Sequence, residues 1–131
     1  MPGTTTFGDS PALAGELLAL IVDGPKRATA GAVDDYAADG EPLPVVNTCV
    51  VATDGGGRPR AVLRTTEVRI GPLSSVDDGF AWDEGEGDRT RIYWLNAHTQ
   101  YFRRRFAALN LAFHDDIEVV FERFEVVYTE P

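Results

Sequence analysis

Residues 117–129 read Ile117-Glu118-Val119-Val120-Phe121-Glu122-Arg123-Phe124-Glu125-Val126-Val127-Tyr128-Thr129 and carry a clear strand signal. Valine, isoleucine, phenylalanine and tyrosine dominate the stretch, and these residue types fit the pleated surface of a sheet. Successive side chains of a strand point to opposite faces, and both faces of this stretch are largely apolar. A strand that is apolar on both faces is covered on both sides. The sequence therefore places residues 117–129 in the interior of a sheet.

Upstream of this strand, the middle of the chain predicts a hairpin. Val45–Thr53 is an apolar run, and Arg58–Ile70 alternates Thr and Val with polar residues. Asp54-Gly55-Gly56-Gly57, between the two segments, has the composition of a tight turn. Gly71-Pro72 ends the second strand because both residue types interrupt regular structure.

Helices separate the predicted strands. Apolar residues recur at helical spacing after Ser10-Pro11, which predicts a helix to about Asp23 with Ser10 as its N-cap. We expect a short helix over Ala30–Ala38, a loop or short helical piece over Ser74–Asp83, and a long helix over about Asp88–Leu109. The predicted fold is α+β, a small mixed and curved β-barrel with surrounding helices. The chain, residues 1–131, is expected to form one domain with its core in about residues 7–128.

Composition limits the classes of function. The chain has 131 residues, 44% apolar and 25% charged, which is a globular composition. Its net charge of −9 excludes sequence-blind binding to long duplex DNA, because that mode requires a broad basic surface. A small anionic ligand or a short single strand in a local basic pocket stays compatible with the charge.

Targeting signals and disulfides are not expected. Met1–Gly8 lacks the basic segment and apolar core of a signal peptide, and no apolar run approaches the about 20 residues of a membrane helix. Cys49 is the only cysteine, so we predict a small buried strand residue rather than part of a disulfide or thiolate metal site. We therefore expect a cytoplasmic protein without a membrane partner, either a monomer or a weak homodimer.

Lys26 is the single lysine among twelve Lys and Arg residues. Unlike arginine, lysine can lose its proton or act as a compact point charge. It lies in Gly24-Pro25-Lys26-Arg27-Ala28-Thr29, where Gly24 ends the first helix and Pro25 begins a new turn. On a helical turn, Lys26 and Thr29 would share a face. A cation and a hydroxyl beside free backbone N–H groups predict an anion or oxyanion site.

The long predicted helix carries two stripes of side chains. The stripe expected to face the core consists of Ile92, Leu95, Thr99, Phe102 and Phe106. An aromatic and basic stripe beside it consists of Arg91, Trp94, His98, Tyr101 and Arg105. Two interpretations of this second stripe stay open. It is either a helix shoulder whose rings pack and whose Arg head groups reach water, or the wall of a base-binding pocket.

Four motifs occur together along the chain. They are Gly24-x-Lys26-x-x-Thr29, Ala81-x-x-Glu84-Gly85-Glu86-Gly87-Asp88-Arg89, Tyr93-Trp94…His98 and Glu122-Arg123-Phe124-Glu125-Val126-Val127. In combination they resemble the ASCH family, named for a domain of a transcription coactivator, over about Phe7 to Tyr128. The resemblance implies a PUA-like fold, a small β-barrel with helices around it, and an RNA-related role. Some members resemble amidohydrolases that remove the acetyl group from N4-acetylcytidine, and others have been linked to RNA cleavage.

The resemblance also implies site residues. In the acetylcytidine-hydrolysing members the catalytic set is a Lys, a Thr three residues later and a Glu, which correspond by motif to Lys26, Thr29 and Glu84. Those hydrolases carry an Arg two residues after the Thr, where this chain has Gly31. The resemblance therefore does not extend to the substrate contact that this Arg makes. The longer Tyr-Trp…His helix belongs to another branch, whose substrate the resemblance leaves open.

As a catalyst, this set would hydrolyse an amide on a small nucleobase. Lys26 would deprotonate the Thr29 hydroxyl if burial or a nearby Arg27, Arg64 or Arg89 lowered its pKa. Glu84 would hold or protonate the leaving amine if it kept its proton near neutral pH. Backbone N–H groups at the start of the second predicted helix would receive the oxyanion.

As a binding site, the same set would act differently. Lys26 would bind a phosphate, Thr29 would cap a helix and Glu84 would pair with Arg89. We predict binding of RNA or a nucleoside or nucleotide in a cleft around Lys26, with amide hydrolysis and ribonuclease-like activity as alternatives. A purely structural or regulatory module would show none of these properties. The residues expected to contact the ligand are Arg27, Arg64, Arg89, Trp94, His98, Tyr101 and Arg105.

No cofactor or metal is predicted. His98 and His114 are the only histidines, and the chain has neither a His-x-x-x-His motif nor a pair of cysteines. Gly55-Gly56-Gly57 lacks the following Lys and helix of a phosphate-binding loop and is expected to form a turn.

Overall fold

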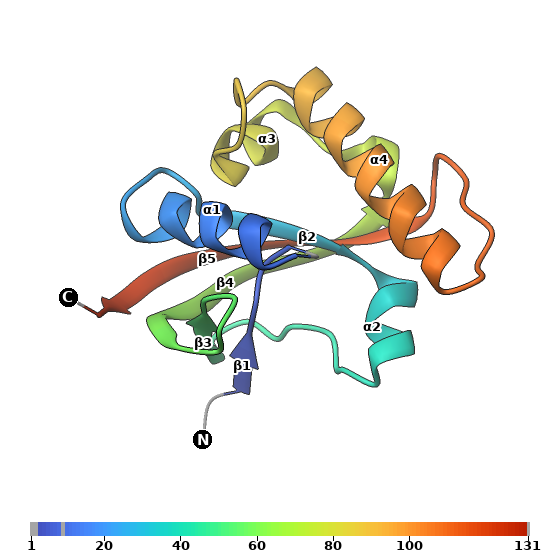
Figure 1. Cartoon of the computed structure of the whole chain (residues 1–131). Coiled ribbons are helices and arrows are strands. Elements are labelled where there is room, and N and C mark those ends of the chain that lie inside the picture. Colours follow the sequence, from blue (N-terminus) through green and yellow to red (C-terminus); the bar gives the residue numbers. More distant parts are fainter. Residues whose placement is uncertain (1–2, 9, 131) are drawn as a thin grey trace.

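The computed structural model of the chain describes residues 3–8 and 10–130. In chain order the elements are β1 Gly3–Thr5, α1 Pro11–Val22, β2 Ala28–Ala32, α2 Val33–Asp39, β3 Cys49–Thr53, β4 Pro59–Pro72, the 3₁₀ turn η1 Leu73–Ser75, α3 Asp78–Glu84, α4 Arg91–Ala108 and β5 Glu118–Thr129. The strands form one sheet, and α3 and α4 lie over one side of it (Figure 1).

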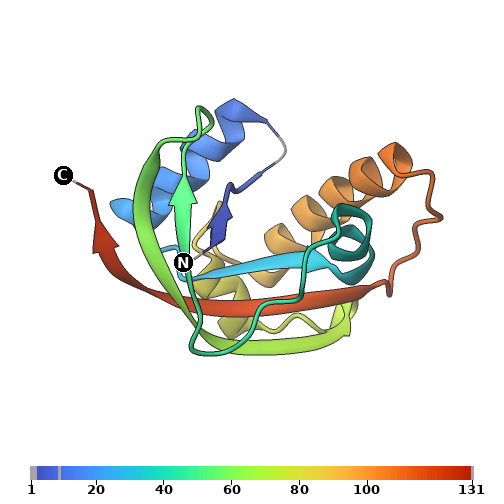
Figure 2. The same cartoon turned by 90° about the horizontal axis from the view of Figure 1, so that it is seen from below.

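The sheet is mixed and strongly curved. Its strand order is β1-β3-β4-β5-β2, with β1 parallel to β3 and all other neighbours antiparallel. The register between β4 and β5 shifts at Val62/Leu63 and again at Thr65/Glu67. Such bulges bend a strand and increase its twist, so the two longest strands curl over and the sheet becomes a half-barrel (Figure 2). The predicted α+β class and mixed, curved sheet are confirmed.

Strand β5 lies between two hydrophobic cores, one on each of its faces. Phe121 packs in a core with Phe80 of α3 and Phe102 of α4. Phe124, on the other face, packs with Leu17 of α1 in a second core. This double burial confirms that residues 117–129 form an interior strand, which β4 and β2 flank.

Local signals fix the helix ends that position the site. The Ser10 hydroxyl accepts a hydrogen bond from the Leu13 N–H at 3.2 Å, so α1 begins where the sequence predicts. Asp77 caps α3 in the same way through the Phe80 N–H, and Thr90 caps α4 through the Tyr93 N–H. The hairpin turn is also as predicted, because Asp54 accepts hydrogen bonds from two N–H groups of the turn.

The short elements differ from the predictions. Ala28–Ala32 is a strand paired with β5, and the second helix begins only at Val33, although the sequence predicted a helix over Ala30–Ala38. Ala favours helices, but here the β5 edge supplies a hydrogen-bonding partner, and tertiary pairing overrides the local propensity. Strand β1 was not predicted, because its three residues gain their order from the distant β3. Strand β3 begins at Cys49 rather than Val45, and Cys49 is half-buried.

Helix α4 is rotated relative to the predicted core face. Phe102 and Phe106 are buried as expected, but Ile92 is 73% exposed and Trp94 is only 2% exposed. The aromatic and basic stripe therefore supplies part of the core contact. Among residues 3–8 and 10–130, no helix is both long and apolar enough to cross a membrane.

Candidate functional site

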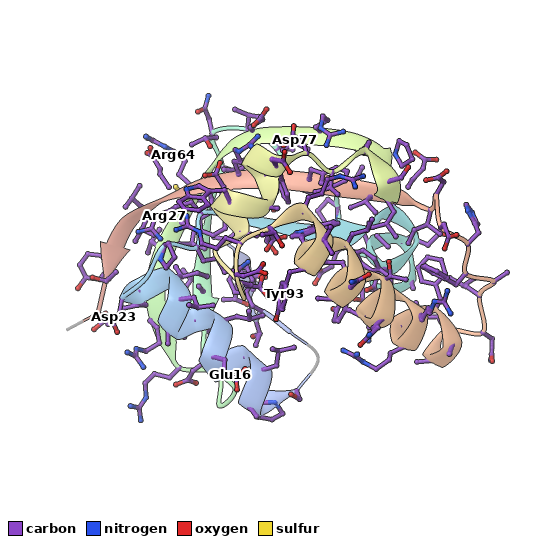
Figure 3. All side chains as sticks on the ribbon, turned by 90° about the horizontal axis from the view of Figure 1, so that it is seen from above. Glu16, Asp23, Arg27, Arg64, Asp77 and Tyr93 are labelled. Carbon is purple, nitrogen blue, oxygen red and sulfur yellow. The ribbon has the colours of Figure 1, made fainter. Side chains whose placement is uncertain are left out.

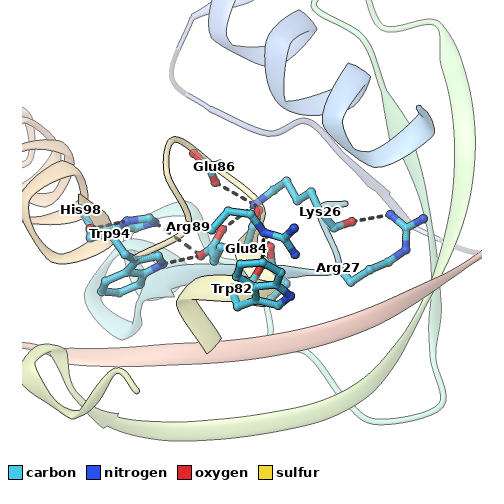
Figure 4. A network of polar contacts seen from close by, with 9 residues as sticks. Lys26, Arg27, Trp82, Glu84, Glu86, Arg89, Trp94 and His98 are labelled. Carbon is cyan, nitrogen blue, oxygen red and sulfur yellow. Dashed lines mark hydrogen bonds and ion pairs between the residues drawn. The ribbon is translucent and has the colours of Figure 1, made fainter. Parts of the chain in front are cut away.

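Lys26 lies in the short segment between α1 and β2, with its side chain turned into the protein. The side chain is 1% exposed. Its ammonium donates hydrogen bonds to the carbonyl oxygen of Ala28 at 2.7 Å, to Oε1 of Glu84 at 2.5 Å and to Oε2 of Glu86 at 2.9 Å (Figure 4). Since an ammonium has three N–H donors, these acceptors engage all of them.

Glu84 ends α3 and is as deeply buried as Lys26. Its second oxygen, Oε2, accepts a hydrogen bond from Trp94 Nε1 at 3.0 Å and lies 3.5 Å from His98 Nε2. The His98 ring stacks on Trp94 with centroids 3.9 Å apart, and its Nδ1 lies 3.0 Å from the carbonyl oxygen of Trp94. We call Lys26, Glu84, Glu86, Trp94 and His98 the Lys26 cluster.

Two glycines allow the chain to fold back over Lys26. Gly85 has φ +70°, and a Cβ there would lie 2.9 Å from both the Cα and the backbone nitrogen of Lys26. Gly87 has φ +60°, and a Cβ there would lie 2.3 Å from the ring of Tyr93. The Glu84-Gly85-Glu86-Gly87 segment therefore directs both of its carboxylates to one ammonium, because neither Gly85 between them nor Gly87 after them has a side chain.

The charges of the cluster determine its protonation. Burial opposes the charged form of Lys26, but the carboxylates of Glu84 and Glu86 outweigh it and raise the lysine pKa above its ordinary 10.5. Burial would raise the pKa of Glu84, but the Lys26 and His98 side chains hold it well below its ordinary value. The pKa of Glu86 is raised, first by burial and also by the neighbouring Glu84. Lys26 and Glu84 are thus an ion pair, and Glu86 is the carboxyl that takes up a proton most readily.

These charges bear on the catalytic hypothesis. That hypothesis requires a lowered Lys26 pKa and a Glu84 that keeps its proton, and both shifts have the opposite direction. The arginines expected to act on Lys26 bind elsewhere. The Arg27 guanidinium donates to the carbonyl oxygens of Ile21 in α1 and of Lys26. That of Arg89 donates to the Trp82 carbonyl and covers the Trp82 ring. Arg64 pairs with Glu125 at the surface, over β4 and β5 (Figure 3).

Thr29 faces a different space. Ala28 and Ala30 on β2 pack in the α3–α4 core, so the side chain between them points to the other face of the strand. There Thr29 lines a cavity of about 480 Å³. In the described part of the chain, no hydrogen bond joins its hydroxyl to Lys26 or Glu84. The structure brings Lys26 and Glu84 together and places Thr29 apart from them.

We call this space the Glu122 cavity. Every strand of the sheet contributes to its lining, through Thr4, Thr29, Val50, Thr65 and Glu122 among others, so it occupies the inside of the half-barrel. The Oγ1 of Thr65 donates a hydrogen bond to Oε2 of Glu122 at 2.7 Å. Burial raises the pKa of Glu122, although this hydrogen bond opposes the shift.

Tyr36 and Tyr101 supply aromatic walls for the Glu122 cavity. Burial, reinforced by nearby carboxylates, raises the pKa of Tyr36, so its hydroxyl keeps its proton at neutral pH. A Cβ on Gly31 would lie 2.9 Å from the Tyr36 ring. The Tyr36 ring therefore occupies the space that a side chain at position 31 would need.

The remaining predicted contact residues divide between the two regions. Trp94 and His98 belong to the Lys26 cluster, where Trp94 is too deeply buried to stack on a base. Tyr101 lines the Glu122 cavity. Arg105 borders a neighbouring groove, but its guanidinium binds both carboxylate oxygens of Asp35, at 3.0 and 2.6 Å. Two Arg–carboxylate hydrogen bonds leave this charge paired within the protein.

Sequence reasoning missed three residues of these regions, Glu86, Tyr36 and Glu122. Glu86 occurs in one of the four motifs but was given no role, and its available signal was the alternation of Glu and Gly over residues 84–87. Glu122 stood in a quoted motif, but its role depends on Thr65, which lies 57 positions away in the chain. Among the described residues, no three His, Cys, Asp or Glu side chains gather as a metal-ligand set.

Comparison with known proteins identifies the family. The sequence profile of the ASCH domain matches residues 3–128. The chain belongs to the ASCH domain family. A crystal structure of an ASCH domain from Lactobacillus crispatus JV V101 matches with a TM-score of 0.87 and 32% identity, over 96% of this chain and 79% of that one. A protein from Enterococcus faecalis V583 matches with a TM-score of 0.87 and 37% identity, over 97% and 77%. None of the curated proteins compared matches this ASCH domain.

Proposed function

We propose that this ASCH domain binds a nucleoside in the Glu122 cavity and that the Lys26 cluster holds the adjoining β2 edge in place. The observation that supports this most is the cavity itself. Its volume of about 480 Å³ falls in the range of small-molecule sites, about 300–1,000 Å³. Tyrosine rings at its wall and hydroxyl and carboxyl groups on its strands combine an apolar surface with a few hydrogen-bonding groups, as such sites do.

Charge favours a nucleoside over a nucleotide or an RNA strand. In the described part of the chain, the ionisable carboxylates that line the cavity are Asp35, Asp39, Glu41 and Glu122, and no Lys or Arg lines it. Arg105 already pairs with Asp35, so a phosphate would lie near the remaining carboxylates without a free cation from the lining, which weakens binding. Among RNA-related ligands, a single unphosphorylated nucleoside therefore suits the Glu122 cavity best.

Titration calorimetry with cytidine, uridine, adenosine and guanosine, each compared with its 5′-monophosphate, tests the proposal. At least one nucleoside should bind saturably and more tightly than its monophosphate, with a preference that shrinks as salt screens the carboxylates. Thr29→Val should weaken binding by about fivefold if its hydroxyl bonds to the ligand, since one hydrogen bond contributes about 1 kcal/mol. Thr66→Val, on an exposed position of β4, is the matched control. Flat titrations with all four nucleosides would reject the proposal.

Amide hydrolysis of N4-acetylcytidine-type compounds stays a prediction, with less support than nucleoside binding. The sequence predicts Lys26, Thr29 and Glu84 as its catalytic set, and the structure adds Glu86 beside Lys26, whose raised pKa suits a group that delivers a proton to a leaving amine. The separation of Thr29 from Lys26 and the charge of Lys26 in the free protein weigh against it. Acetate release from N4-acetylcytidine that depends on Thr29 and Glu86 would establish this activity. Ribonuclease-like activity, a cytoplasmic location and a monomeric or weakly dimeric state are likewise predictions of the sequence.

A further inference from the structure

We propose that the Glu122 carboxylate accepts hydrogen bonds from two adjacent N–H groups of the ligand. The Glu122 cavity would therefore select a guanine-type edge or an amidine-like group. The proposal deepens the proposed function and rests on it for the nucleoside, but the carboxylate chemistry also applies to other donors. Glu122 is a specificity-determining residue in this view, and no catalytic role is assigned to it.

The position of Glu122 suits this role. It lies near the middle of β5, where Thr29 of β2 pairs with it on one side and Val68 of β4 on the other. Both neighbouring strands hold the backbone by hydrogen bonds, so the carboxylate is presented from a rigid element rather than from a loop. It faces the inside of the half-barrel, together with Thr29 and Thr65.

The hydrogen bonding of Glu122 leaves acceptors for a ligand. Within residues 3–8 and 10–130, the Thr65 hydroxyl is the one side-chain group that donates a hydrogen bond to this carboxylate, and it binds Oε2. A carboxylate offers about four lone-pair sites, so Oε1 and part of Oε2 can accept two parallel N–H bonds. No buried side-chain oxygen or nitrogen of the described residues lacks a partner, so the open oxygen faces the cavity and not packed protein.

The surroundings select donors rather than acceptors. Asp39 and Glu41 at the wall also carry oxygens that accept, whereas both oxygens of Asp35 are bound by Arg105. Neighbouring N–H groups of a ligand satisfy these carboxylates, while the Thr and Tyr hydroxyls of the wall can serve either a donor or an acceptor. Among the common bases, guanine presents two adjacent donors, N1–H and the N2 amino group. Inosine lacks the amino group and so provides a matched ligand.

Calorimetry on the full chain with guanosine, inosine and benzamidinium tests the inference. Wild type should bind guanosine about tenfold or more tightly than inosine, because a bidentate base contact discriminates by about 1–3 kcal/mol. Glu122→Gln should remove most of this preference and weaken benzamidinium binding by about tenfold or more. Thr65→Val keeps the charge of Glu122 but removes the hydroxyl that orients its carboxylate. The affinities for guanosine and benzamidinium should therefore fall several-fold. Thr65→Val also serves as a second variant should Glu122→Gln fail to fold, which circular dichroism will show.

The outcomes separate this inference from the proposed function. Equal binding of guanosine and inosine, or unchanged affinities in both variants, would overturn the role of Glu122 while leaving nucleoside binding intact. Glu122-dependent binding of benzamidinium without any nucleoside binding would support the donor selection and reject the proposed function. Binding of neither ligand class to wild type would reject both.

Discussion

The ammonium of Lys26 lies 2.5 Å from Oε1 of Glu84, and both side chains are 1% exposed. The pair joins the segment after α1 to the end of α3, across 58 positions of the chain. Removing two charges from water is costly, and the pair is stable only because each partner also has further hydrogen bonds. It follows that the single lysine of this chain has a structural role that its sequence context did not reveal.

Removing either partner of the Lys26–Glu84 pair should destabilise the protein. Lys26→Met leaves Glu84 as a buried carboxylate without its cation, so we expect a loss of about 3–5 kcal/mol in the free energy of unfolding, measured by urea denaturation. Glu84→Gln should destabilise in the same direction. The double variant should lose clearly less than the sum of the two, because the pair is coupled. Additive losses would show that the two side chains do not depend on each other.

Substitution of Gly85 should destabilise the protein more than substitution of a glycine in a similar backbone conformation. Gly85 is the C-cap that follows α3, at φ +70°, and Gly40 is the C-cap that follows α2, at φ +66°. Each Gly→Ala change incurs the left-handed cost of about 1–2 kcal/mol. Only at Gly85 would the new Cβ meet backbone atoms, those of Lys26 and Pro25, whereas at Gly40 nothing lies within 4 Å. Gly85→Ala should therefore lose at least about 1 kcal/mol more than Gly40→Ala in thermal or urea unfolding. Equal losses would contradict the close packing over Lys26.

The raised pKa of Glu122 predicts a dependence of stability on pH. Burial places this pKa above the ordinary 4.5. The stabilising contribution of the bound proton is fully present below 4.5 and is lost as pH rises through the folded pKa. Glu122→Gln has no such proton, so its stability relative to wild type should increase as the pH rises above 4.5 and through the folded pKa of Glu122. Urea denaturation at several pH values measures the difference.

A control on the same strand isolates the effect of burial. Glu118→Gln changes an exposed glutamate of β5 and so measures the effect of removing a carboxylate from this strand without removing a buried one. A Glu122→Gln difference that is constant with pH, or that falls as pH rises, would show that burial does not raise the Glu122 pKa.

Trp94 should matter through its N–H as well as its ring. Trp94→Phe removes the donor to Glu84 Oε2, and hydrogen bonds to charged groups are worth about 1.5–3 kcal/mol. Trp82, the only other tryptophan, is 56% exposed, so Trp82→Phe should change stability by no more than about 0.5 kcal/mol. Unfolding curves followed by circular dichroism give both values. A Trp94→Phe protein as stable as Trp82→Phe would show that the Glu84 carboxylate does not need this donor.

Long elements were predictable from the sequence because their signals are local. The hairpin, α1, α4 and the strand at 117–129 each combine a periodic pattern with turn or cap residues. Strands β1 and β2 lacked such signals, since three and five residues depend on pairing with distant strands. The orientation of α4 also escaped prediction. Both of its stripes contain apolar residues, and the choice between them depends on Glu84, which binds Trp94 from another helix.

The candidate site was predictable only as a set of residues. The motif brought Lys26 and Glu84 into one hypothesis, and the structure places them in contact. Their charges could not be inferred from the motif, because they depend on Glu86 and on the burial of the whole cluster. The position of Thr29 depended on the strand β2, which the sequence had assigned to a helix.

The half-barrel remains open, and its two outermost strands are β1 with three residues and β2 with five. A long exposed strand edge is a template on which further chains can add and grow into aggregates. Edges this short offer few free hydrogen-bonding groups to an incoming chain. The curled sheet therefore keeps an accessible interior without becoming a starting point for fibrils.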